Sequence, residues 1–421
     1  MKSTREIDRN RSIRILSILG QKPEMTGSGI LVRELWQCAL SHEDKQKLIV
    51  AGYADDDYGA LFHEDYALIS YSLENKAGQL PFPILGMSDA MPYPSMRFAN
   101  ADAPQIESHI NAFRAAMEDL IIEFRPDVIH IHHLWVLVVL SNYCGRIPCF
   151  VTIHGTGLKQ LRTAPQLRKY VEEGIKNISH FFSVSKDIMH DACIIYNLPQ
   201  DRVSFIGNGY NEKVFRVEGP VAECKDKLIL AAGKFVDWKG FRFLIRACGK
   251  LKVQHQLVIA GSGPEKNRQE LIDEAVRNNM RGKMVLTGHI PQGELAKWMR
   301  RADVFVLPSI YEPFGLVFLE AMACGSPVIA SDCGGAKDII RERRLTSLGL
   351  GTLIPPLKEG DQSDEDRYVS DFHLALDKHL SHSASHLSRV RISDSVKGLE
   401  WSNIYQSIRA EYLKAISARA Y

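Results

Sequence analysis

Two glutamates, Glu312 and Glu320, are separated by seven residues in the stretch EPFGLVFLE. The Pro-Phe-Gly turn and the short helix predicted after it would point backbone N–H groups and a helix dipole at one spot, which suits a phosphate or a polyhydroxylated ligand. Glu312 precedes a proline in a loop, where an exposed glutamate is ordinary. Glu320 falls inside an apolar helix, where a carboxylate makes sense if it accepts hydrogen bonds from a bound group such as two ribose hydroxyls.

Two lysines, Lys234 and Lys239, follow the apolar strand predicted at 228–232, and each stands next to a glycine. Two loop lysines alone are usually solvated. Beside a helix opened by glycine, however, lysines supply charge and backbone amides supply directional donors for a diphosphate. Gly261 and His289 follow the next two predicted strands. The carboxyl ends of these strands would therefore gather all of these groups at one edge of a sheet, where ligands bind.

The first half of the chain carries a second arrangement of this kind. An apolar strand predicted at 13–19 is followed by a loop containing Gly27 and Gly29 and by an amphipathic helix at 30–40. A strand, a glycine loop and a helix in this order can bind phosphate or another ligand. The same glycines could equally serve an ordinary turn that needs a positive φ, so this motif alone does not decide between the two.

Histidines end two further predicted strands of the first half. The strand at 127–132, DVIHIH, runs into His133 and Trp135, and the strand at 148–153 ends at His154 beside a glycine. Three neighbouring histidines could bind zinc, but no carboxylate or cysteine nearby completes the ligand set. Polar groups at the carboxyl ends of parallel strands more often line a substrate crevice, and we expect His154 to contact a ligand there.

Residues 53–104 are predicted to form a long irregular loop, because they hold many prolines and the aromatic stretch MPYPSMRF at 91–98. Tyr93 and Arg97 lie in this stretch. Asp55–Asp57 could bind a metal ion, but a solvated acidic turn is favoured because adjacent side chains splay apart.

The order of the predicted elements indicates the fold class. Strands alternate with helices through both halves of the 421-residue chain, a pattern typical of α/β proteins with two doubly wound parallel sheets. A chain of this length is too long for a single hydrophobic core. The polar segment 215–227 is the predicted linker, so that one domain covers 1–212 and a second covers 213–400, before a helix predicted at 401–418.

Composition narrows the class of protein. The formal net charge is +2, which disfavours a dedicated nucleic-acid binder. No apolar run approaches the roughly 20 residues of a membrane helix, and the polar N-terminus has no secretory signal. The eight cysteines form no CxxC pair, which favours reduced thiols and a cytoplasmic location.

Together these motifs resemble the retaining glycosyltransferases of the GT-B fold, family 4 type (glycosyl transferases group 1), over essentially the whole chain. The stretch from Glu312 to Gly325 fits the paired-glutamate signature of that family, and PVIA at 327–330 and the double glycine at 334–335 continue it. The resemblance implies two Rossmann-like domains that face a cleft. The first would bind the acceptor, the second would bind the nucleotide sugar, and helix 401–421 would pack back onto the first.

The resemblance also implies roles for individual residues. Glu312 would contact hydroxyls of the donor sugar, Glu320 would bind the ribose diol, and Lys239 would bind the diphosphate. Lys234 stands where the family usually has arginine, so the charge is kept but the bidentate fork is lost. His154 matches the histidine that approaches the donor sugar, which makes His154, Lys239 and Glu312 the catalytic candidates. Further donor-binding candidates are Gly29, Gly261, His289, Ile290, Phe314, Gly315, Leu316 and Val317, and the acceptor-binding candidates are Gly27, Tyr93, Arg97, His133 and Trp135.

The implied activity is transfer of a hexose-type sugar from a nucleotide diphosphate sugar to a hydroxyl acceptor with retention of the anomeric configuration. Uridine is the commonest donor base in the family. No cofactor or metal ion is expected, because lysines and helix amides would neutralise the diphosphate. The acceptor would be a sugar, a polyol or a lipid-linked molecule, a weak peripheral membrane contact is compatible with the family, and the oligomeric state stays open. An epimerase or phosphorylase of the same fold, and a non-catalytic nucleotide-sugar-binding protein, are the alternatives.

Overall fold

The computed structural model describes residues 11–24, 26–74, 76–88, 91–312, 314–342, 345–357, 362–381 and 384–419. The chain divides into two compact units, of which the first contains residues up to Gly207 together with those from Trp401 onward, and the second contains Asn208–Glu400. The predicted boundary at 212/213 therefore falls inside the second unit. Phe215, in the predicted linker, is buried in a core of that unit, because an aromatic side chain is stabilised there by removal from water.

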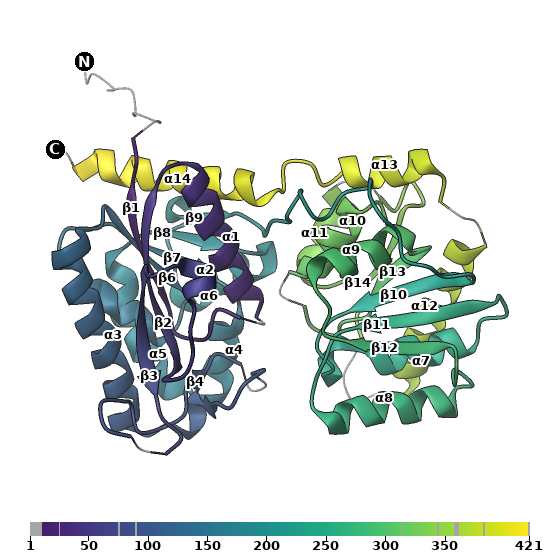
Figure 1. Cartoon of the computed structure of the whole chain (residues 1–421), viewed down its shortest axis with the longest axis horizontal. Coiled ribbons are helices and arrows are strands. Elements are labelled where there is room, and N and C mark those ends of the chain that lie inside the picture. The colour runs from purple at the N-terminus through teal and green to yellow at the C-terminus, as the bar shows by residue number, and fades with distance from the viewer. Residues whose placement is uncertain are drawn as a thin grey trace. The chain divides into compact units, whose positions relative to one another are not determined.

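Within the described residues, the first unit forms a seven-stranded parallel sheet in the order β3-β2-β1-β6-β7-β8-β9 (Figure 1). The strands are β1 (Arg14–Leu19), β2 (Lys45–Tyr53), β3 (Tyr66–Tyr71), β6 (Val128–His132), β7 (Cys149–Ile153), β8 (Ile178–Ser183) and β9 (Val203–Phe205). The central strands β1, β6 and β7 are buried almost throughout, on both faces, as is usual for parallel sheets. The strand order reverses at β1, which pairs with β2 on one side and β6 on the other, and ligands bind at the carboxyl edge of such a point.

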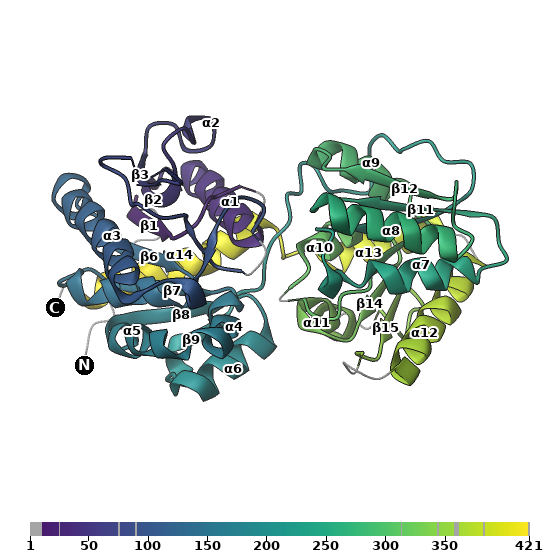
Figure 2. The ribbon, with the colours of Figure 1, turned by 90° about the horizontal axis from the view of Figure 1, so that it is seen from below.

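Helices lie on both faces of this sheet (Figure 2). They are α1 (Gly27–Ser41), α2 (Gly59–Phe62), α3 (Ala103–Phe124), α4 (Thr156–Thr163), α5 (Arg168–Gly174), α6 (Lys186–Tyr196) and α14 (Trp401–Arg419). The last of these, α14, packs against α1 and β8. The helix α14 therefore belongs to the first unit, although it follows the second unit in the sequence.

Residues 53–104, predicted to be irregular, contain the strand β3, the helix α2, and a short parallel pair of strands, β4 (Leu85–Gly86) and β5 (Met96–Arg97). The prediction of a continuous loop is therefore wrong. The strand β3 lies at the edge of the sheet and most of its residues are only partly buried, so it lacks the apolar run that identifies a central strand.

The described part of the second unit forms a six-stranded parallel sheet in the order β12-β11-β10-β13-β14-β15. The strands are β10 (Lys227–Ala232), β11 (His255–Ala260), β12 (Met284–Gly288), β13 (Val304–Leu307), β14 (Val328–Ser331) and β15 (Gly351–Ile354). The helices are α7 (Phe241–Gly249), α8 (Glu265–Arg277), α9 (Gln292–Arg301), α10 (Leu316–Ala323), α11 (Gly334–Glu342), α12 (Gln362–Leu380) and α13 (His386–Asp394).

Two hydrophobic cores cover the two faces of this second sheet. Along β10, Leu228 and Leu230 belong to a core shared with α9, α10, α11 and α13, whereas Ile229 and Ala231 belong to a core shared with α7, α8 and α12. This alternation follows from the two-residue period of a strand. Both units therefore confirm the prediction of two doubly wound, Rossmann-like parallel sheets.

Candidate functional site

The strongest convergence of sequence-predicted residues is at the carboxyl edge of the second sheet. The order reverses at β10, between β11 and β13, and Lys234, Gly261 and Glu312 lie in the loops after these three strands. Lys239, on the same loop as Lys234, donates a hydrogen bond from Nζ to Oε2 of Glu312. Their side chains are only 16% and 9% exposed, so the two opposite charges form a nearly buried ion pair.

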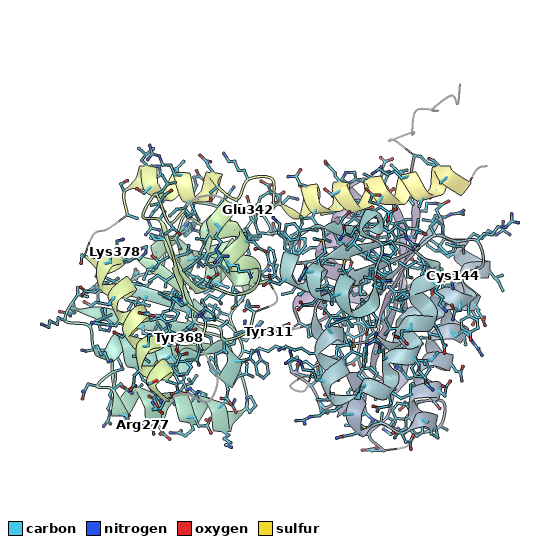
Figure 3. The ribbon with its side chains drawn as sticks, turned by 180° about the vertical axis from the view of Figure 1, so that it is seen from behind. Cys144, Arg277, Tyr311, Glu342, Tyr368 and Lys378 are labelled. Carbon is cyan, nitrogen blue, oxygen red and sulfur yellow. The ribbon has the colours of Figure 1, made fainter. Side chains whose placement is uncertain are left out.

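The chain on either side of Glu312 is held by its own neighbours. Ser309 Oγ donates to Glu312 Oε2 over 3.3 Å, and the Ile310 N–H donates to the Trp238 carbonyl over 2.8 Å. Tyr368 of α12, which is labelled in Figure 3, donates to the Pro308 carbonyl over 3.1 Å. The carboxylate is therefore fixed in position before any ligand binds.

Two glycines allow the loops after the strands to approach each other. Gly240 has φ +69°, and a Cβ there would lie 1.9 Å from the Pro308 carbonyl oxygen, on the loop that carries Glu312. Gly261 has φ +149°, and its Cβ would lie 1.9 Å from the carbonyl oxygen of Gly233. No larger residue fits either contact without moving backbone.

The helix α10 begins in the same place. Gly315, at φ +88°, precedes its first residue, and no side chain caps that end of the helix. The first-turn amides of Leu316 and Val317 therefore lack a side-chain acceptor, and such amides bind anions. A Cβ on Gly335 would lie 2.4 Å from the Phe314 ring, so the ring rests directly on that glycine. Pro313 lies outside the described residues.

Burial shifts the pKa values of ionisable groups at this edge of the sheet. Desolvation, and then the neighbouring ammonium of Lys239, lower the pKa of Lys234 from its usual 10.5. Desolvation and the carboxylate of Glu312 raise the pKa of the Cys333 thiol to about 12. An anion bound beside the two lysines would relieve the repulsion between them, whereas a second cation would increase it.

The remaining donor-binding candidates of the second unit differ in how far they are buried. Glu320 of α10 is buried, with 6% of its surface exposed, as its apolar surroundings in the sequence predicted. His289 is exposed, and Ile290 is partly buried against the core that also contains α10. The structure thus brings Lys239 and Glu312 into contact and places the other candidates on the loops and the helix around them.

The glycine loop of the first unit is a close-packed turn. A Cβ on Gly29 would lie 2.2 Å from the Pro23 carbonyl oxygen, and the Gly29 N–H donates to Thr26 Oγ1, which caps α1. Gln21 donates to the same Thr26 oxygen. Gly29 is therefore required by the backbone, whereas Gly27, the first residue of α1, is exposed.

Sequence reasoning missed an ion pair beside the acceptor-binding candidate Tyr93. Lys22 pairs with Asp56 over 2.6 Å, and its ammonium lies 4.9 Å from the ring centre of Tyr53 and 5.5 Å from that of Tyr93. Asp56 also accepts a hydrogen bond from the Tyr58 hydroxyl. The interpretation of this acidic triplet as a solvated turn is therefore wrong for Asp56. A lysine inside the glycine loop was the sequence feature that could have indicated an ion pair here.

The histidines of the first unit form a buried array. His130 bonds Tyr412 of α14 through Nδ1 and Thr152 through Nε2, and its ring stacks on His132 with centroids 4.5 Å apart. The rings of His133 and His154 lie 4.6 Å apart. Burial lowers the pKa of His130 and of His133 to about 3, so both imidazoles are neutral near pH 7.

Other candidates in this unit have contrasting environments. Trp135 and His154 are buried, at 1% and 8% exposure, whereas Arg97 is exposed. Within the described ranges, no group of three histidine, cysteine, aspartate or glutamate side chains is placed to hold a metal ion. Nor does the described part of the chain include a helix long and apolar enough to cross a membrane.

Comparison with known proteins gives matches along both units. Residues 91–214 match the family model "Glycosyltransferase Family 4", and residues 218–363 match "Glycosyl transferases group 1". An uncharacterized glycosyltransferase of Methanocaldococcus jannaschii is 35% identical over 235 residues, which cover 51% of this chain and 60% of that protein. The matched region thus spans less than two thirds of the length of that relative.

Solved structures with GT-B architecture match almost the whole chain. Sucrose-phosphate synthase of Thermosynechococcus elongatus superposes with a TM-score of 0.72 at 20% identity, covering 97% of this chain and all of that one. The Anabaena protein HepE, solved in complex with UDP and glucose, superposes with a TM-score of 0.64 at 16% identity, covering 94% of this chain and 98% of that one. At sequence identities of 20% or less, these similarities show the fold alone.

Proposed function

The chain belongs to the family 4 type of glycosyltransferases with the GT-B fold, and from that premise we propose that it transfers a hexose-type sugar from a nucleotide diphosphate sugar to a hydroxyl group of an acceptor. The observation that carries the proposal is the Lys239–Glu312 pair beside the uncapped start of α10. Cations, helix amides and a fixed carboxylate at one sheet edge suit a diphosphate joined to a polyhydroxylated sugar.

Each group has a proposed part in holding the donor. Lys239 and Lys234 bind the diphosphate, with the first-turn amides of α10 as directional donors. Glu312 accepts hydrogen bonds from sugar hydroxyls, and Glu320 accepts them from the ribose. In the first unit, His154 contacts the donor sugar as a neutral imidazole, because burial lowers its pKa well below 6.5.

The proposed reaction retains the configuration at the anomeric carbon. The bond from that carbon to the phosphate oxygen breaks, the acceptor oxygen bonds to the same face, and the acceptor proton passes to the departing phosphate oxygen. Lysines and amides stabilise the charge that develops on the diphosphate, so we propose that no metal ion is required. Uridine is the proposed base; the Anabaena structural neighbour was solved with UDP.

A binding and turnover experiment tests this function. Thermal shifts with UDP, GDP and ADP should show stabilisation by one nucleotide that grows with concentration, and the matching nucleotide sugar should be hydrolysed slowly in EDTA. Lys239→Ala and Glu320→Ala should each abolish donor binding, whereas Lys250→Ala, which changes an exposed lysine at the end of α7, should bind normally. Wild-type affinity and turnover in both site variants would contradict the assignment.

A further inference from the structure

A pocket lies between the helices α7 and α8 of the second unit, beside the loop that runs from β10 to α7, and Figure 1 shows the two helices next to each other. The buried side chains of Phe235, Phe241 and Leu271 contribute apolar groups to its wall. Its volume is about 270 Å³ for the centre of a water-sized sphere. One water molecule needs roughly 10–15 Å³ by this measure, so the pocket has room for a small organic molecule.

Three arginines of this wall share two carboxylates. Glu365 of α12 accepts from Arg242 Nη2 over 3.0 Å and from Arg246 Nη1 over 3.2 Å. Glu274 of α8 accepts from Arg246 Nε over 2.7 Å and from Arg277, which is labelled in Figure 3, over 2.6 Å. Desolvation raises the pKa of Glu274, but the hydrogen bonds from the two arginines outweigh it, so the pKa lies below its usual 4.5 and the carboxylate is charged near pH 7. Three guanidinium groups and two carboxylates therefore leave one positive charge uncompensated within the network.

The same arginines keep hydrogen-bond donors that the protein does not use. A guanidinium has five N–H groups in a planar fork. Among the described residues, Arg246 bonds carboxylates through two of its nitrogens, and Arg242 and Arg277 through one each. Both oxygens of Glu274 are already bonded, since Oε1 also accepts from Asn278 over 2.9 Å. The arginines that line the pocket therefore offer it unused, positively charged donors.

The other acidic residues of the pocket are exposed, unlike Glu274. Asp237 and Glu270 also line it, and both are open to water. The Glu270 side chain is 54% exposed, and the Lys266 ammonium lies 3.8 Å from it. Water and salt screen exposed charges strongly, so these two carboxylates weaken the positive potential of the arginines without cancelling it. The pocket therefore favours an anion over a cation.

We propose that this pocket binds a small oxyanion, held by Arg242, Arg246 and Arg277. The planar fork of a guanidinium matches both phosphate and carboxylate groups, so the ligand is a phosphate monoester or a polycarboxylate. The apolar part of the wall suits the carbon skeleton of such a molecule. The site is separate from the edge at which Lys239 and Glu312 meet, because neither residue lines the pocket, and it does not depend on the proposed function.

Calorimetric titration of the full chain tests the proposal, with glycerol 3-phosphate and citrate as anionic probes and glycerol as the neutral probe. At least one of the two anions should bind saturably, whereas glycerol should not. Comparison of the two affinities identifies the class of oxyanion that the pocket prefers. Because ion pairs at a partly exposed site are screened by salt, the affinity should fall as the concentration of sodium chloride rises.

Variants with opposite expected effects locate the binding. Arg242→Gln and Arg277→Gln each remove a charged donor from a side chain that is 42% and 64% exposed, respectively, and each should weaken binding of the anion about tenfold. Glu270→Gln removes a repelling charge without removing a donor, and it should strengthen binding about threefold. The matched controls are Arg268→Gln and Glu265→Gln, which change exposed residues of α8 that do not line the pocket. Both controls should bind the anion as the wild type does.

Lys239→Ala distinguishes this pocket from the proposed donor site, and it should bind the anion as the wild type does. Loss of binding in Lys239→Ala, together with unchanged affinity in Arg242→Gln and Arg277→Gln, would mean that the anion binds at the edge of the sheet, and would overturn the inference. Failure of both anions to bind the wild-type chain would overturn it as well, because the arginines would then serve only to join α7, α8 and α12. Weaker binding in both arginine variants, together with stronger binding in Glu270→Gln, would support it.

Discussion

At the scale of single residues, the Lys239–Glu312 pair links the stability of the second unit to the proposed binding of the donor. Both side chains are largely removed from water, so each charge depends on the other. Removing one partner of such a pair is costly because the remaining charge stays buried without compensation. Under the proposed function, the pair must separate or share its hydrogen bonds when a diphosphate binds Lys239. Because the ion pair already holds both charges in position, binding of the proposed donor would not have to order them.

The ion pair predicts that the effects of substituting Lys239 and Glu312 on the free energy of unfolding are not additive. Lys239→Ala should lower the free energy of unfolding by about 3 kcal/mol, since it strands the Glu312 carboxylate. The double variant Lys239→Ala/Glu312→Ala should be more stable than the Lys239→Ala single variant, because no buried charge is left over. Urea denaturation followed by circular dichroism measures both values. A double variant that loses the sum of the two single losses would show that the pair does not couple.

The lowered pKa of Lys234 predicts a dependence on alkaline pH. Its ammonium loses its proton below the usual 10.5, so the cation disappears earlier than in an ordinary lysine as the pH rises. The affinity for the nucleoside diphosphate should therefore decline as the pH rises toward that value. In Lys234→Arg it should decline less, because a guanidinium stays charged. Calorimetric titrations compare the two proteins with one ligand, so that ionisation of the ligand cancels. Parallel curves would contradict the assignment of Lys234 to the diphosphate.

At the scale of elements, strand ends and glycines were predictable because their signals are local. The apolar runs that became β10 and β13 and the glycines beside Lys234 and Lys239 can be identified within a few residues of sequence. The Lys22–Asp56 pair joins residues 34 positions apart, and the Tyr71–His109 hydrogen bond joins residues 38 positions apart. Such contacts depend on the fold, and no local pattern encodes them.

The turn at Gly240 links local sequence to this long-range packing. Gly240→Ala would force a Cβ against the Pro308 carbonyl and hold a non-glycine residue at φ +69°. We expect it to lower the free energy of unfolding by about 2 kcal/mol or more. Because Pro308 lies on the loop that carries Glu312, donor affinity should fall as well. Thermal melting with and without nucleotide measures both effects, and Gly293→Ala provides the control for an added methyl. Unchanged melting would mean that the two loops separate easily.

At the scale of the whole molecule, the last helix completes the first unit. Asp44, which precedes β2 and has a fully buried side chain, accepts hydrogen bonds from the Tyr405 hydroxyl over 2.6 Å and from Arg409 Nε over 2.7 Å. It also accepts from the Ile13 N–H over 2.8 Å. The first sheet is thus joined to residues 361 and 365 positions later in the chain. The first unit cannot reach its final packing until the second unit has been synthesised.

This connection predicts that a destabilising substitution in α14 lowers the stability of the first unit only. Arg409→Met removes the guanidinium and leaves the Asp44 carboxylate buried with fewer donors, which should lower the stability of the first unit by about 3–5 kcal/mol. Asp44→Asn/Arg409→Met removes both charges and should recover part of the loss. Hydrogen exchange measured by mass spectrometry resolves the two units. Peptides from β1, β2 and α14 should exchange faster in Arg409→Met, while peptides from β10 and β13 should keep their wild-type rates. Equal acceleration in both units would instead mean that the molecule unfolds as one cooperative body, and that the stability of the second unit depends on α14.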